Sequence, residues 1–349
     1  QAQIDRMNGL VANLTINQPQ DGKYYRIRCT DGNKYLSSNT NDAGRILMTS
    51  ATDQSNIFYY TNGGLLSYNR GVYIHAESSS NQVKLREVAK TSTAEFIDGK
   101  DNNKSGSYII YVKNSEAGAG RYIHGKNDTT DSGKDKPING VYQGYTWWLE
   151  EVTELPVNIT TAGYASFYAP VAVTVPSGIE AHYLTKIIGE FASMTKIEGG
   201  TIPANTGVIL TGENGEPATE GTYNLAITIN DVSINNNMFK GTIATEYVTG
   251  DAYVLAIKDN NVGLYSVTLN KENGNAFQNN SHKAYLPAGT STMQMSAGFR
   301  FSFGGTTDIE VVETESENVK AIYDLTGRKL ESIAGPGIYI IDGKKVIVK

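Results

Sequence analysis

Residues 22–152 contain a pattern that recurs three times, with an uneven period of about forty to fifty residues. Each copy reads as a strand, a turn with Gly or Asn, a second strand containing Tyr-Leu or Tyr-Ile, a longer polar loop, and a strand that closes on a large aromatic residue. One such unit cannot bury its own apolar face, so the three must pack together, and closing them into a barrel leaves no free sheet edge. The closing aromatic residues, which we expect to meet around a pseudo-threefold axis, are Phe58, Phe96 and Trp148.

These three units resemble the β-trefoils of the ricin-B and fascin-like families. The resemblance covers residues 17–154 and implies a lectin-like β-trefoil. Ricin-type units commonly close on Gln-x-Trp. The corresponding triplets of this chain lack the glutamine, and they are Asn56-Ile57-Phe58, Ala94-Glu95-Phe96 and Thr146-Trp147-Trp148. The resemblance therefore implies the fold without the ricin-type sugar contacts.

The chain on either side of the repeat predicts two further parts. Residues 1–16 carry apolar residues at helical spacing, which predicts a helical linker. This helix either packs on the next domain or ends a larger upstream region, and the missing N-terminal cap favours the second. Residues 155–305 are strand-like and punctuated by prolines, which favours a central antiparallel β-sandwich-like domain.

The last part, residues 306–349, begins with an acidic connector and ends in short strand-like segments around the turns Thr326-Gly327 and Asp342-Gly343. Its segments Ala321–Leu330 and Gly337–Lys349 resemble the C-terminal sorting modules of proteins that certain Gram-negative bacteria export by the type IX system. The resemblance implies a secreted or cell-surface protein associated with the outer membrane. The expected fold class is therefore all-β, with an N-terminal β-trefoil, a central β-sandwich-like domain and a short C-terminal β module.

Composition agrees with this class and excludes several kinds of partner. The 36 glycines and 22 tyrosines are typical of a β protein with many turns. A net charge of −6 without a basic stripe argues against nucleic acid, and no apolar run is long enough to span a membrane. The single cysteine, Cys29, reads as a core residue, and no Cys/His spacing predicts a metal. We expect no cofactor and a monomer.

No catalytic residues are predicted, and the chain is not expected to be an enzyme. It lacks a nucleophile elbow and a phosphate-binding glycine motif, and most of its carboxylates lie in turns. His75 and His124 occupy equivalent places in the second and third copies. They predict either two related polar sites or two strand-end residues that bond to loop carbonyls, and the second interpretation is favoured.

Aromatic residues of the third copy are the best candidates for a binding site. If Trp148 points inward, strand alternation turns Trp147 outward, where its ring could stack on a sugar. Alternatively, Trp147 packs against the next domain or under the loop 125–145. That loop also supplies polar side chains that a glycan site needs. The candidate ligand-binding residues are Trp147, Tyr145, Tyr142, Asp128, Asn139, Gln143, His124 and His75.

Three hypotheses follow from these features. The first is a non-catalytic region of an exported bacterial protein that binds a glycan or a host or cell-surface polysaccharide. The second is the accessory C-terminal part of a larger glycoside hydrolase or other secreted hydrolase. The third is a structural or adhesive surface protein without a small ligand.

Overall fold

The computed structural model describes sixteen stretches of the chain, and all of its strands lie within them. These stretches are 3, 18–30, 34–40, 46–76, 83–86, 92–99, 106–114, 120–123, 146–229, 233–289, 298–303, 322–324, 329–330, 333, 335–341 and 344–348. The described residues form strands joined by turns and short 3-10 helices, which confirms the predicted all-β class. Apart from Gln3, the expected helix over residues 1–16 lies outside these stretches.

An eleven-stranded sheet, which we call the N-terminal region, contains the three repeated units. The strands of the first unit are β1 (Lys23–Cys29), β2 (Tyr35–Thr40), β3 (Ile46–Thr49) and β4 (Ile57–Thr61). Those of the second are β5 (Gly64–Ser67), β6 (Tyr73–Ala76), β7 (Val83–Arg86) and β8 (Ser92–Asp98). Those of the third are β9 (Tyr108–Asn114), β10 (Gly120–Tyr122) and β11 (Trp147–Glu151).

Strand pairing repeats from unit to unit within the described residues. The first strand of each unit pairs with the second, as β1–β2, β5–β6 and β9–β10. The units follow one another through the pairs β4–β5 and β8–β9, and the last strand, β11, returns to pair with β1. Between β5 and β8, the Ala94 amide donates to the Gly63 carbonyl at 2.6 Å. The sheet thus runs around a closed path.

The core inside this path is apolar, and it corrects the predicted orientation of the tryptophans. Phe58 and Phe96 are buried in it as expected, but the third large ring is Trp147, which is 0% exposed. The pairing of β11 with β1 sets Trp147 opposite the buried Cys29 and Trp148 opposite Arg28. Residues opposite each other share a face of the sheet, so this register turns Trp147 inward.

Trp148, on the opposite face, is half-buried. Its ring lies under the Arg28 guanidinium, whose carbon is 4.4 Å from the ring centroid. The expectation that Trp148 is the third closing aromatic was therefore wrong, because Trp147 takes that place, and of the two interpretations of Trp147 the packed one holds. The repeat alone could not decide between two adjacent tryptophans, because either one could stand for the closing aromatic.

Strands β12 to β26 form the central region. A four-stranded sheet has the order β12-β19-β14-β17, and its strands are β12 (Glu154–Ile159), β19 (Gly221–Ile227), β14 (Val173–Thr174) and β17 (Thr201–Ile202). A separate short sheet has two strands, β21 (Glu246–Thr249) and β24 (Ala276–Asn279).

A nine-stranded sheet completes the central region, in the order β13-β18-β15-β16-β26-β23-β22-β25-β20. Its strands are β13 (Ala165–Phe167), β18 (Val208–Thr211), β15 (Glu180–Ile188), β16 (Phe191–Lys196), β26 (Gly298–Phe303), β23 (Asn261–Ser266), β22 (Ala252–Lys258), β25 (Lys283–Pro287) and β20 (Lys240–Thr242). All its pairs are antiparallel except β16–β26, which is parallel and so departs from the purely antiparallel expectation. Parallel neighbours need a long crossover, and strands of the same sheet lie in the chain between these two.

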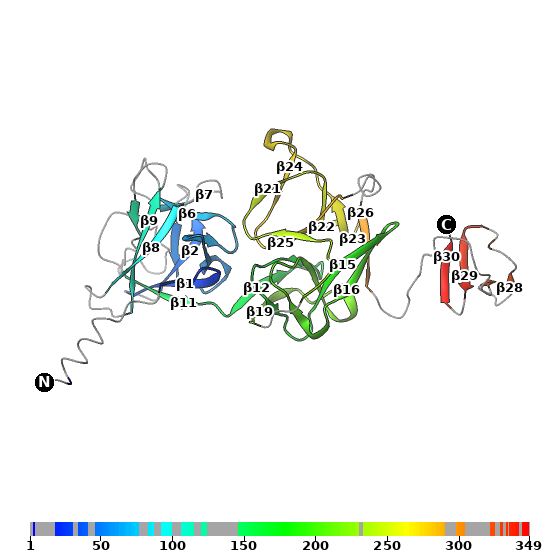
Figure 1. Ribbon diagram of the computed structural model, residues 1–349, viewed down its shortest axis with the longest axis horizontal. Helices are drawn as coiled ribbons and strands as arrows, with labels where there is room; N and C mark the ends of the chain where they lie inside the picture. Colours follow the sequence, from blue (N-terminus) through cyan, green and yellow to red (C-terminus); the bar gives the residue numbers. More distant parts are fainter. Residues whose placement is uncertain are drawn as a thin grey trace.

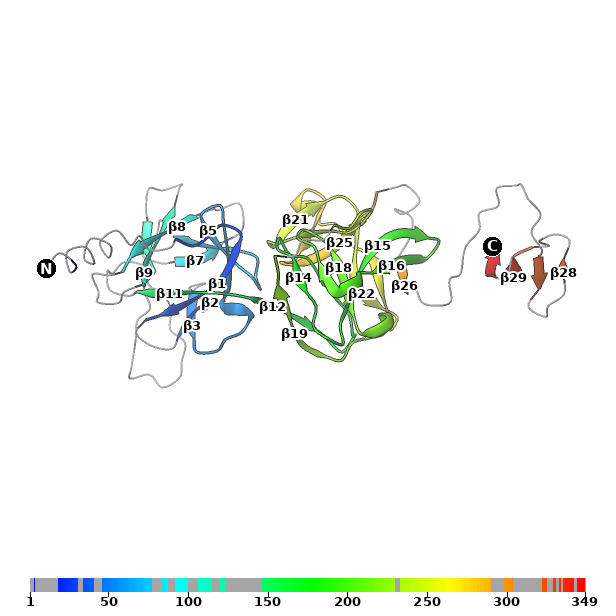
Figure 2. The same cartoon turned by 60° about the horizontal axis from the view of Figure 1, so that its bottom comes forward.

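The N-terminal and central regions lie side by side, and β11 leads directly into β12 (Figure 1 and Figure 2). They share one apolar core, in which tyrosines of the first region pack with Leu155 and Phe167 of the second. The buried tyrosines of this shared core are Tyr24, Tyr59, Tyr68 and Tyr73. Because this packing joins the two regions, the surface between them is held in a defined shape, and the candidate site lies there.

The C-terminal residues form a sheet of their own, in the order β28-β27-β29-β30. Its strands are β27 (Ile322–Asp324), β28 (Lys329–Leu330), β29 (Gly337–Ile341) and β30 (Lys344–Val348). The two turns predicted between these strands lie outside the described residues. No described helix is long and apolar enough to cross a membrane.

Candidate functional site

The residues that the sequence singles out do not come together as an open site in the described part of the chain. Trp147 is buried, and its Nε1 donates to the Ile123 carbonyl at 3.0 Å. His75, on β6, is also buried, and its Nδ1 lies 2.8 Å from the hydroxyl of Ser92 on β8. His75 thus links two strands of the second unit. The other candidates lie outside the described residues, and they are Tyr145, Tyr142, Asp128, Asn139, Gln143 and His124.

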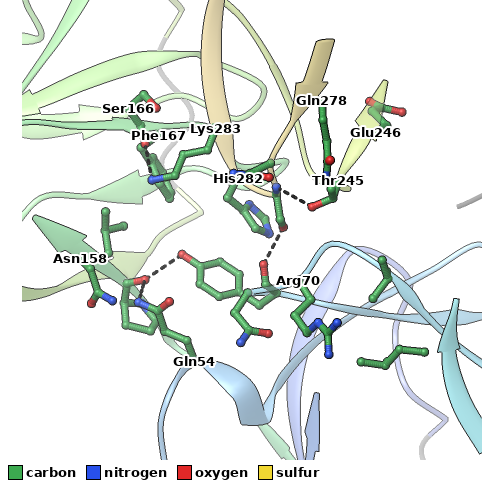
Figure 3. A pocket seen from close by; sticks show the side chains of 18 of the residues that line it. Gln54, Arg70, Asn158, Ser166, Phe167, Thr245, Glu246, Gln278, His282 and Lys283 are labelled. Carbon is green, nitrogen blue, oxygen red and sulfur yellow. Dashed lines mark hydrogen bonds between the residues drawn. The ribbon is translucent and has the colours of Figure 1, made fainter. Parts of the chain in front are cut away.

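A large hollow lies instead between the N-terminal and central regions. This cleft has a volume of ≈ 1060 Å³. Figure 3 shows its walls, with Gln54 and Arg70 on the N-terminal side and His282 and Lys283 on the central side. It is lined by Gln54, Tyr68, Asn69, Arg70, Val72, Leu85, Pro156, Val157, Asn158, Ser166, Phe167, Thr245, Glu246, Tyr247, Gln278, Asn280, Ser281, His282 and Lys283.

Tyr68, just after β5, holds the two walls of the cleft together. Its hydroxyl donates to the Pro156 carbonyl at 2.9 Å, and its own carbonyl accepts from the Ser281 hydroxyl at 2.6 Å. Its ring lies 4.3 Å, centroid to centroid, from the imidazole of His282. The side chain is 5% exposed, so these bonds are shielded from water. Tyr68 is therefore a structural residue at the base of the cleft.

A close backbone contact reinforces this joint. The amide of Thr245 donates to the carbonyl of Gly71 at 2.9 Å. Gly71 has φ +59°, and a Cβ at this position would lie 2.2 Å from the Thr245 nitrogen. Only glycine permits both the left-handed backbone and this approach. The sequence thus positions the central region against the loop after β5.

His282 lies at the cleft in the neutral form. Its backbone has φ +55°, and its Nδ1 donates to the Tyr168 carbonyl at 2.9 Å. Nε2 is buried and has no hydrogen-bond partner among the described residues. Burial lowers the pKa of this imidazole to about 4, because a charged ring would lose its hydration there. The ring therefore contributes packing and one open lone pair rather than charge at neutral pH.

Lys283 and Arg70 are the two cations of the cleft. The Lys283 ammonium donates to the Ser166 carbonyl at 3.4 Å, and desolvation by burial lowers its pKa. Arg70 is exposed and donates to the Ser38 carbonyl at 3.3 Å. Among the described residues, neither side chain forms an ion pair. Among the described residues that line the cleft, Glu246 is the only one with a carboxylate.

A second hollow of ≈ 660 Å³ continues the cleft, because four of its lining residues are shared with the first. Together they form a groove rich in side-chain amides, each of which offers both a donor and an acceptor. The amide residues that line the groove are Asn39, Gln54, Asn69, Asn158, Asn224, Gln278 and Asn280. An exposed aromatic ring, Tyr247 at 50%, stands at the same surface.

Outside the groove, the buried pair Glu180 and His182 is the most notable titratable cluster. His182 Nε2 lies 3.6 Å from a Glu180 carboxylate oxygen, and burial lowers the pKa of His182 to about 4. Glu180 also forms an ion pair with Lys196. The described residues contain no group of three His, Cys, Asp or Glu placed to hold a metal ion. The groove is thus the site with the richest binding chemistry in the described structure.

Sequence reasoning missed this groove because its residues come from distant segments, from Gln54 to Lys283. No family model matches the chain, and no curated protein sequence matches it.

Proposed function

We propose that this protein is a non-catalytic, carbohydrate-binding region of an exported bacterial protein, and that the sugar occupies the groove between the N-terminal and central regions. The observation that carries the proposal is the concentration of amide side chains in one large open cleft. The proposed site therefore differs from the tryptophan site that the sequence suggested.

Amides suit a saccharide because each sugar hydroxyl both donates and accepts a hydrogen bond. Asn158 and Gln278 face the cleft from the central region and are exposed, as is Asn69 from the N-terminal region. The ring of Tyr247 offers a flat apolar surface for the C–H face of a pyranose. A volume of ≈ 1060 Å³ exceeds that of ordinary small-molecule sites, which favours an oligosaccharide over a single sugar.

Two further proposals set the context. The repeated pairing scheme and the return of β11 to β1 support a β-trefoil for the N-terminal region. The four-stranded C-terminal sheet is compatible with a sorting module, whose resemblance supports export to the cell surface.

A glycan array followed by titration calorimetry on the full chain tests the proposal. Asn158→Ala, Gln278→Ala and Tyr247→Ala should each weaken binding about tenfold, the effect of losing one good hydrogen bond or ring contact. Asn273→Ala removes an exposed amide that lies outside both hollows and serves as the matched control. If no saccharide binds, or if the three cleft variants bind as tightly as the control, the groove is not a carbohydrate site.

A further inference from the structure

The two hollows of the groove differ in charge. Counting the described lining residues, the first contains Lys283 and Arg70 against a single carboxylate, Glu246. The second contains one cation, Arg26, against three carboxylates, which are Asp53, Glu151 and Glu154. A ligand that runs along the groove therefore meets a positive field at one end and a negative field at the other.

Lys283 is the most distinctive group of the positive end. Three other lysines of the described chain pair with carboxylates, and these pairs are Lys23 with Glu151, Lys113 with Glu95 and Lys196 with Glu180. Lys283 is half-buried, yet within the described part of the chain its ammonium has one hydrogen bond, to the neutral Ser166 carbonyl at 3.4 Å. A partly desolvated ammonium without an anionic partner is costly, and a carboxylate or sulfate from a ligand would repay that cost.

Its surroundings leave room for such an anion. Lys283 and Arg70 lie on either side of His282 in the view of Figure 3, and all three line the same cleft. His282 is neutral, so it neither repels an anion nor competes with one for Lys283. Glu246, the one carboxylate of the lining, lies on β21, away from Lys283 in the same view.

We propose that the groove selects acidic saccharides, and that a uronate carboxylate or a sulfate of the ligand pairs with Lys283 while Arg70 strengthens the attraction. This inference rests on the proposed carbohydrate binding and names the class of sugar. The negative end of the groove then sets the orientation of the bound saccharide, because it repels a second acidic group there and accepts neutral or amino sugars.

The test uses the full chain and matched ligands that differ only in charge. One pair is an oligosaccharide with a single uronic acid and its methyl ester, and the other is an oligosaccharide with a single sulfate and its desulfated form. We expect the acidic member of one pair to bind about tenfold more tightly, as a charge-assisted hydrogen bond implies, with a preference that shrinks as NaCl is added. Which pair shows the preference distinguishes a carboxylate from a sulfate.

Lys283→Met keeps the aliphatic stem and should abolish this preference, whereas Lys283→Arg should retain it. Lys258→Met removes an exposed charge on β22 outside the groove and should leave it unchanged. Thermal unfolding checks that the variants are folded. If the methionine variant is not, Lys283→Gln, which also removes the charge, replaces it and should likewise lose the preference.

Three outcomes overturn the inference. Equal affinity for the acidic and neutral members means that the groove binds sugars without reading charge, and the proposed function survives. A preference that survives in Lys283→Met, or falls equally in Lys258→Met, means that general attraction and not this ammonium selects the acid. Binding to no saccharide of either kind refutes the proposed function and this inference with it.

Discussion

Protonation of His282 should destabilise the joint between the N-terminal and central regions. In the folded protein, burial lowers the pKa of this imidazole from 6.5 to about 4. Its folded pKa is below its unfolded pKa, so the unfolded chain binds the proton more readily, and stability is lost as the pH falls from about 6.5 through about 4. At about 1.4 kcal/mol per pKa unit, the full loss is about 3 kcal/mol.

About 2 kcal/mol of that loss should be present at pH 5, where the unfolded imidazole is charged and the folded one is still neutral. The free energy of unfolding, measured with urea at pH 7 and pH 5, should therefore fall more in the wild type than in His282→Asn. Asparagine suits the test because it tolerates the φ of +55° at this position better than other residues do. The ring contacts with Tyr68 and Tyr24 are lost at both pH values and cancel in the difference.

His182→Asn is the matched control for this experiment. His182 is also buried with a pKa near 4, but it lies beside Glu180 and away from the cleft. The two single variants should each remove their own share of the pH dependence, and the double variant should remove both, because the sites share no partner. If His282→Asn keeps the full wild-type loss between pH 7 and pH 5, the reasoning about the buried imidazole is refuted.

Two further predictions concern packing. Gly71→Ala should lower stability by about 2–4 kcal/mol, because alanine is strained at φ +59° and its Cβ would meet the Thr245 nitrogen; urea unfolding measures the loss, and a change below 0.5 kcal/mol would contradict the close contact. Trp147→Ala should cost about 3–5 kcal/mol, as truncation of a buried large aromatic does. Trp148→Ala, which removes a half-exposed ring and its contact with Arg28, should cost about 1 kcal/mol. A larger loss of stability from Trp148→Ala than from Trp147→Ala in urea unfolding would contradict the observed register.

Features of this fold could be predicted from the sequence where the interacting residues lie close together along the chain. Alternation and turn residues act over a few positions, and the three copies recur along the chain, so the all-β class and the buried Phe58 and Phe96 followed from the sequence. The adjacent pair Trp147 and Trp148 did not, because a shift of one residue exchanges the two faces of a strand. That choice depends on pairing with β1, more than a hundred residues earlier in the chain.

The groove separates what the sequence determines from what the tertiary structure determines even more clearly. The sequence by itself determined that the chain makes strands, where its units repeat, and which residues must be apolar to bury a unit. Only the tertiary structure decided that Gln54, Asn158 and Lys283 share one surface, because that depends on how two packed regions meet at Tyr68 and Gly71. Local patterns encode secondary structure, whereas a site between regions exists only once their cores have merged.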